Sequence, residues 1–226
     1  MKGEPFFKVD RVDLEFLRRD WENLAEPYTA DRRIVERWFQ HLVKLYSARG
    51  RAYHNLSHIR SLMVLGDSVK GRLRNCDGLK FAVWFHDAVY HTRRKDNEER
   101  SAELASQSLI ELGVPAELRE LVGEMILATK QHQTDGSSTD LDYFLDLDLS
   151  ILGSEEQTYL RYSAAIRREY WWVPRGTYRR GRQEVLASFL NRKSIYYTEE
   201  MGLRYEQQAR RNIEHEIESL LTNTRT

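Results

Sequence analysis

Residues 34–46 read IVERWFQHLVKLY, and their apolar positions recur every three or four residues. The positions are Ile34, Val35, Trp38, Phe39, Leu42, Val43 and Tyr46. Side chains with this spacing share one face of an α-helix, and that face must be buried against other elements. Gly50, which follows, is typical of a residue that ends a helix. The stretch predicts an amphipathic helix.

The same periodicity recurs along the chain and predicts an all-α fold. Further helices are expected at residues 12–24, 55–69, 77–89, 96–113 and 116–132, in the segment up to 170, around 182–190 and at 199–221. Asp96 and Glu99 have the spacing of a capping box. Only four prolines occur in 226 residues, and no strand-like alternation is sustained. We expect a single-domain helical bundle over residues 1–226, with the polar stretch 133–140 as an internal loop.

The charge balance argues against whole classes of partner. Lys plus Arg and Asp plus Glu both number 35, so no net field favours a nucleic acid or an anionic membrane. The single cysteine, Cys76, cannot form an internal disulfide, which fits a reducing compartment. We see neither a secretory signal nor an apolar run of membrane-spanning length. The sequence therefore predicts a cytoplasmic protein without nucleic-acid or membrane partners.

Three short segments concentrate side chains that bind metals. Residues 53–58 read YHNLSH, and on a helix His54 and His58 would project from one face. Residues 84–90 read WFHDAVY, which places His86 and Asp87 in an apolar helix where an unpaired carboxylate is costly. Residues 144–152 read FLDLDLSIL. Its two acidic residues cannot share a helical face, so we expect at most one of them to point inward.

Each segment also has an ordinary structural explanation. A histidine in a helix is commonly a hydrogen-bonded core or surface residue, a His-Asp pair occurs by chance, and an Asp among leucines is commonly a cap. Together the three segments supply two imidazoles and two carboxylates, a mixed N/O set that suits Zn²⁺, Fe²⁺, Mn²⁺ or a similar ion. We therefore interpret them as one metal site.

The order of these motifs resembles the HD superfamily of metal-dependent phosphohydrolases. Tyr-His-Asn-x-x-His, then His-Asp, then Asp-Leu-Ser is similar to the arrangement in cyclic-nucleotide phosphodiesterases, one branch of that superfamily. The similarity covers residues 50–152. The chain as a whole resembles small bacterial proteins described only as predicted HD-superfamily phosphohydrolases. The resemblance implies a helical bundle of the HD type, with C-terminal helices at 155–222 packing on the metal-site region and supplying substrate contacts.

The resemblance also implies a role for individual residues. His58, His86, Asp87 and Asp148 match the metal ligands, with Asp87 bridging when two metals are bound. His54 matches the histidine that donates a proton to the leaving oxygen. The cofactor would be one or two divalent ions among Zn²⁺, Mn²⁺, Fe²⁺, Mg²⁺, Co²⁺ and Ni²⁺.

Two positions between the His-Asp pair and the last Asp bear on substrate specificity and on a second metal. Tyr90 stands where the phosphodiesterase pattern has a further histidine, with His91 one place later, which argues against cyclic-nucleotide specificity. His132 is a candidate ligand of a second metal. A histidine near a helix C-terminus, favoured by the helix dipole, is the alternative interpretation of His132.

Residues 166–182 read IRREYWWVPRGTYRRGR, with six arginines and four aromatics around one glutamate. Arginine forks bind phosphate oxygens and aromatic faces stack on bases. The candidate substrate-binding residues are Arg175, Arg179, Arg182 and Tyr178. The alternative is a solvated helix pair with a core tryptophan.

Taken together, the sequence predicts a phosphohydrolase that uses a metal-activated water on a nucleotide or another small phosphate ester. A divalent ion lowers the pKa of its water to roughly 7 in the case of zinc, which yields a hydroxide at neutral pH. Two alternatives share the scaffold: a di-iron oxygenase with His132 as a further ligand, and a non-catalytic nucleotide-binding regulatory module that works through the basic aromatic segment. The oligomeric state stays open.

Overall fold

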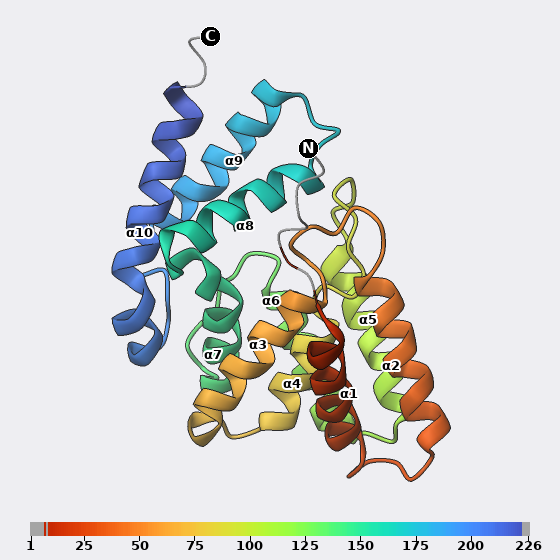
Figure 1. Ribbon diagram of the computed structural model, residues 1–226. Coiled ribbons are helices and arrows are strands. Elements are labelled where there is room, and N and C mark those ends of the chain that lie inside the picture. The colour runs from red at the N-terminus through yellow and green to blue at the C-terminus, as the bar shows by residue number, and fades with distance from the viewer. Residues whose placement is uncertain (1–6, 8, 223–226) are drawn as a thin grey trace. The chain divides into compact units, whose positions relative to one another are not determined.

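The computed structural model describes Phe7 and residues 9–222, and within them it contains ten α-helices, two short 3-10 helices and no strand (Figure 1). This confirms the all-α class. The elements are α1 (Arg11–Ala25), α2 (Arg32–Tyr46), α3 (Leu56–Val69), η1 (Lys70–Arg72), α4 (Cys76–Phe85), α5 (Asn97–Glu111), α6 (Ala116–Ala128), α7 (Thr139–Leu149), η2 (Ser150–Gly153), α8 (Glu156–Glu169), α9 (Arg175–Leu190) and α10 (Glu199–Thr222). Among these helices, none is both long and apolar enough to cross a lipid bilayer.

The packing divides the chain within α7, between Leu145 and Asp146, into two compact units. The first contains α1 to α6 and the beginning of α7. The second contains the last residues of α7, then η2 and α8 to α10. The expected single domain over residues 1–226, with its C-terminal helices packed on the metal-site region, stays a prediction.

An aromatic core holds the first unit together. The buried apolar positions of α2 are Val35, Trp38, Phe39, Leu42 and Tyr46. The rings of Trp21 and Trp84 meet edge to face with centroids 5.6 Å apart, and Trp21 Nε1 donates to the Val35 carbonyl over 2.9 Å. Because these rings bury large areas and Trp21 also bonds to the backbone of α2, they fix how α1, α2 and α4 pack.

Side-chain caps explain where several helices begin. Asp10 makes a full capping box, and Asp31, Asn55 and Asn75 each accept from a backbone amide of the first turn. The predicted capping box at α5 is wrong, because no side-chain cap is made by Asp96. Its carboxylate instead accepts from Arg94 Nε over 2.7 Å.

In the second unit, α10 packs on η2 and α9. A glycine makes the first of these contacts: a Cβ at Gly153 would lie 2.6 Å from Tyr205 Cβ, so only glycine lets η2 approach α10 this closely. Further along α10, Glu216 accepts a hydrogen bond of 2.6 Å from Tyr159 Oη of α8. The second unit is thus tied together by both backbone contact and buried polar pairs.

Candidate metal centre

His58 lies in the first turn of α3, and its side chain is buried. The helix begins here because Asn55 Oδ1 accepts from the Ser57 amide over 2.8 Å, while Asn55 Nδ2 donates to the Ala52 carbonyl over 3.1 Å. Ile59 beside it is fully buried in the core. The cap and the core contacts together fix the position from which the imidazole projects.

His86 and Asp87 lie at the end of α4 and not inside it. The helix ends at Phe85, His86 is its C-cap, and Asp87 lies in the turn that follows. The prediction of a helix running on to residue 89 is therefore wrong. The Ala88 amide bonds back to Phe85 over 3.0 Å, and the Val89 amide bonds to Ser101 Oγ over 3.0 Å. These hydrogen bonds replace those of the helix, and the chain leaves the axis of α4.

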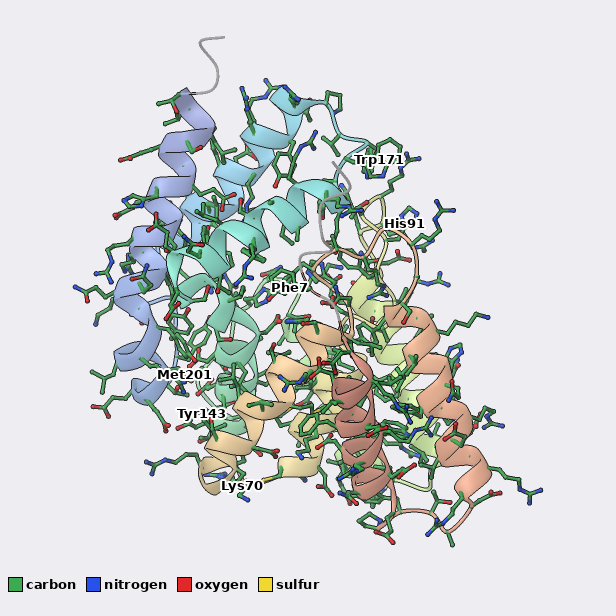
Figure 2. The ribbon with its side chains drawn as sticks, viewed as in Figure 1. Phe7, Lys70, His91, Tyr143, Trp171 and Met201 are labelled. Atoms are coloured by element: carbon green, nitrogen blue, oxygen red, sulfur yellow. The ribbon has the colours of Figure 1, made fainter. Side chains whose placement is uncertain are left out.

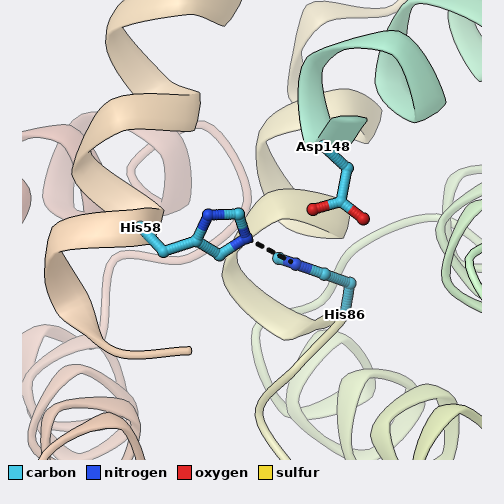
Figure 3. Close-up of side chains that lie close together, drawn as sticks. All are labelled: His58, His86 and Asp148. Carbon is cyan, nitrogen blue, oxygen red and sulfur yellow. Dashed lines mark hydrogen bonds between the residues drawn. The ribbon is translucent and has the colours of Figure 1, made fainter. Parts of the chain in front are cut away.

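Three of the predicted ligands come together. One donor atom each from His58, His86 and Asp148 lies within 4.8 Å of the others, a group able to hold a metal ion (Figure 3). The Nε2 atoms of the two histidines are 3.2 Å apart. Two ligands about 2.1 Å from one ion at tetrahedral or octahedral angles would be roughly 3.0–3.4 Å apart. The histidine pair has the spacing of two ligands of one ion.

The fourth predicted ligand, Asp87, contacts the same histidine. Its Oδ2 atom lies 3.2 Å from His86 Nε2. His86 Nδ1 lies 2.9 Å from the Val83 carbonyl, which can only accept, so Nδ1 carries the proton. A carbonyl-bonded Nδ1 is the usual support of a metal-ligating histidine, because it leaves Nε2 to face the ion.

His54 reaches the same region by a route other than the expected one. It lies before α3, which begins at Leu56, so the shared helical face with His58 is wrong. Its Nε2 atom is 3.9 Å from Asp87 Oδ2, and its ring stacks on Tyr90 with centroids 4.2 Å apart. His54 is therefore held beside Asp87 by loop geometry and stacking.

The two acidic residues of α7 have different surroundings. Asp146 is completely buried, and its carboxylate accepts from the backbone amides of Tyr197 and Thr198 over 2.7 and 2.8 Å. Asp148 is the member of the metal-binding group. Of the two, Asp146 is fully buried and Asp148 is half-buried.

His132 lies beyond α6, in a turn, with a positive φ of 47°. Its amide donates to the Ala128 carbonyl over 2.9 Å, which continues the end of the helix. Among the described residues, the group of mutually close donor atoms does not include His132. Its assignment to a second metal stays a prediction without support from this geometry.

The basic aromatic segment forms the end of α8, a turn and the start of α9. Trp171 in the turn is 74% exposed (Figure 2). Arg167 is structural: it donates to the carbonyls of Tyr170 and Val173 over 2.7 and 3.1 Å, and its guanidinium lies 4.6 Å from the Tyr178 ring centre. The segment is thus an ordered turn.

The four candidate substrate residues of this segment separate into two pairs. Arg175 is exposed and Arg179 half-buried, and for these two substrate binding stays a prediction. Tyr178 is buried, and burial raises its pKa to about 12. Arg182 pairs through Nε and Nη2 with the Glu216 carboxylate at 2.9 and 3.0 Å. The geometry favours a structural role for Tyr178 and Arg182.

One residue at the centre was missed by sequence reasoning. Arg51 donates hydrogen bonds to the carbonyl oxygens of His54, Asp87 and Ala88, and thereby connects the loop before α3 with the turn after α4. Nothing in the local pattern around Arg51 indicates these partners, which lie up to 37 positions away.

No protein-family model, curated protein or solved structure matches the chain.

Proposed function

We propose that this chain is a metal-dependent phosphohydrolase that acts on a nucleotide or another small phosphate ester. The observation that carries the proposal is the group of His58, His86 and Asp148 donor atoms within 4.8 Å of one another, with Asp87 beside it. Two imidazoles and two carboxylates favour transition metals such as Zn²⁺, Fe²⁺ or Mn²⁺ over Mg²⁺, which prefers oxygen ligands.

The residues fit one divalent ion. His58 and His86 would bind it through Nε2, and Asp148 and Asp87 through carboxylate oxygens. When bound, such an ion supplies Lewis acidity, which makes water a better nucleophile near neutral pH and offsets negative charge on a phosphoryl group. The chain orients the ligands beforehand, because the Val83 carbonyl holds the His86 ring and the Asn55 cap fixes the start of the helix that carries His58.

His54 is the residue best suited to move a proton. Its Nε2 atom lies 3.9 Å from Asp87 Oδ2, which is longer than a hydrogen bond. Stacking on Tyr90 restrains the orientation of the ring. In the proposed reaction His54 donates its proton to the oxygen of the leaving group.

The substrate class follows from the resemblance to HD-superfamily phosphohydrolases and from Tyr90. At this position cyclic-nucleotide phosphodiesterases have a further histidine, whereas here a tyrosine ring covers one face of His54. A phosphomonoester or an open-chain nucleotide is therefore favoured over a cyclic nucleotide. The di-iron oxygenase alternative needs further ligands, and the group of close donor atoms among the described residues does not include His132.

The test combines metal analysis with a substrate screen. The purified protein is stripped with a chelator, reloaded separately with Zn²⁺, Mn²⁺ and Fe²⁺, and assayed against phosphomonoesters, phosphodiesters and nucleotides. We expect phosphate release that depends on the added metal and is lost in His86→Ala. Phosphate release that persists in the stripped protein would contradict the proposal. Tight nucleotide binding without release of phosphate from any ester would replace it with the regulatory module.

A further inference from the structure

Arg51 lies in the loop between α2 and α3, three residues before His54. Its Nη1 atom donates to the carbonyl oxygens of His54 over 3.0 Å and Asp87 over 2.8 Å, and its Nη2 atom donates to the Ala88 carbonyl over 2.8 Å. Hydrogen bonds from a charged donor are stronger than neutral ones. One guanidinium therefore links the two segments that carry the histidines of the site.

Two tyrosine rings hold this guanidinium in place. It lies 4.9 Å from the ring centre of Tyr46 and 5.5 Å from that of Tyr90. Both distances are within the range of cation–π attraction. Tyr46 is itself fixed, because its hydroxyl donates to the Trp84 carbonyl over 3.0 Å. Tyr90 in turn stacks on His54. A series of side-chain contacts therefore connects the core, through Arg51 and Tyr90, to the proposed proton donor.

The carbonyls that Arg51 binds have a special need for a donor. Asp87 and Ala88 follow the end of α4, where carbonyl oxygens have no amide of the same helix to accept from. A cation near a helix C-terminus is also favoured by the helix dipole. Arg51 satisfies these oxygens and, with the same group, fixes the loop that contains His54.

We propose that Arg51 is a positioning residue, which holds the segment of His54 and His58 against the turn of His86 and Asp87. Its importance for metal binding rests on the proposed function, since the imidazole pair it positions is the candidate metal centre. The position needs arginine rather than lysine. A planar guanidinium can direct N–H groups to three carbonyls while lying near aromatic rings, whereas an ammonium is a point charge on a flexible chain.

The test uses Arg51→Lys and Arg51→Met in the full chain, with Arg49→Lys and Arg49→Met as matched controls, since Arg49 is exposed in the same loop. Calorimetric titration of the chelator-stripped proteins with Zn²⁺ measures metal affinity. Amide hydrogen exchange of the metal-free proteins measures whether the loop and the turn are still held. Far-UV circular dichroism verifies the helical content of every variant.

We expect Arg51→Lys to keep its helical content and to bind Zn²⁺ about 10–100-fold more weakly, the usual effect of losing a residue that supports metal ligands. Amides of residues 52–58 and 86–90 should exchange faster, while those of α5 keep the wild-type rate. The Arg49 variants should match the wild type in both measurements.

Two results would overturn the inference: Zn²⁺ affinity within about threefold of wild type in both Arg51 variants, or unchanged exchange in both segments. Failure of the proposed function is distinguishable from either. If the wild type binds Zn²⁺ but hydrolyses no ester, the phosphohydrolase proposal fails, while weaker Zn²⁺ binding in Arg51→Lys still supports the inference. If the wild type binds no divalent ion, the exchange rates alone decide the role of Arg51.

Discussion

The Nε2 atoms of His58 and His86 face each other at 3.2 Å, although the two residues are 28 positions apart in the chain. The Nδ1 atom of His86 lies 2.9 Å from the Val83 carbonyl, and its Nε2 atom lies 3.2 Å from both His58 Nε2 and Asp87 Oδ2. With Asp148, the two histidines form a group that could hold a metal ion.

Replacing His86 with alanine should remove most bound metal and leave a helical protein. The ring supplies one of the three mutually close donor atoms, and its loss leaves one imidazole to bind the ion. Elemental analysis of the purified variant measures the effect. His91→Ala is the control, because His91 is exposed in the loop after Tyr90. Wild-type metal content in His86→Ala would disprove the assignment of the site.

His54→Ala should keep the metal and lose activity. A general acid contributes roughly 10²–10⁴-fold to turnover, and the loss should shrink for an acidic leaving group such as a nitrophenolate. Comparing an alkyl phosphate with a nitrophenyl phosphate in the wild type and the variant measures this difference. Equal losses for both substrates, together with loss of metal, would make His54 a metal ligand instead. Full activity on the alkyl phosphate would exclude both roles.

Asp146→Ala should lower the stability of the protein, whereas Asp148→Ala should weaken metal binding. Loss of Asp146 leaves the amides of Tyr197 and Thr198 without their acceptor, and we expect the free energy of unfolding to fall by about 3 kcal/mol. Metal content per folded molecule should stay unchanged. Asp148→Ala should lose metal, with less effect on the stability of the metal-free protein. Denaturant unfolding and elemental analysis together decide it, and identical behaviour of the two variants would contradict the division of roles.

Arg182→Ala should destabilise the protein rather than weaken substrate binding. The side chains of Arg182 and Glu216 are 9% and 7% exposed, so the change leaves a carboxylate buried without its partner. Breaking such a pair costs about 3–5 kcal/mol. The exposed Arg175→Ala is the control and should change stability by less than about 0.5 kcal/mol. Unchanged denaturant stability of Arg182→Ala with a raised KM would restore its role in substrate binding.

The same ion pair predicts a loss of stability in acid. Burial raises the pKa of Glu216, but hydrogen bonds and charge from Arg182 outweigh it, so the pKa lies below its usual value. A depressed pKa contributes stability above the unfolded value, about 4.3, and this contribution is lost as the pH falls through the folded pKa. Denaturant unfolding from pH 6 to 3 should show a smaller acid-induced loss in Glu216→Gln than in the wild type. Parallel curves would contradict the prediction.

Local sequence predicted most of the helices, because their signal is local, but it gave no separate helix for the acidic stretch that forms α7 (Thr139–Leu149). The apolar spacing of residues 34–46 predicts the buried face of α2, and Asn55 marks the beginning of α3. The same reasoning overextended α4 past Phe85 and gave Asp96 a cap that it does not make. Both errors occur at helix ends, where the outcome depends on the partners of side chains such as Ser101 and Arg94.

The sequence by itself determined the helical class and the residues of the candidate centre, since periodicity and residue chemistry are properties of short segments. Only the tertiary structure decided how those residues are used. It brings the Nε2 atoms of His58 and His86 within 3.2 Å and pairs Arg182 with Glu216. It also makes the Asp146 carboxylate accept from backbone amides just before α10, and makes Arg51 donate to three carbonyls. Each of these partners lies 28 or more positions from the residue it binds, except the His54 carbonyl three residues after Arg51. Hydrogen bonds and ion pairs require atoms within a few ångströms, and for residues so far apart only the packing of the helices brings the atoms that close.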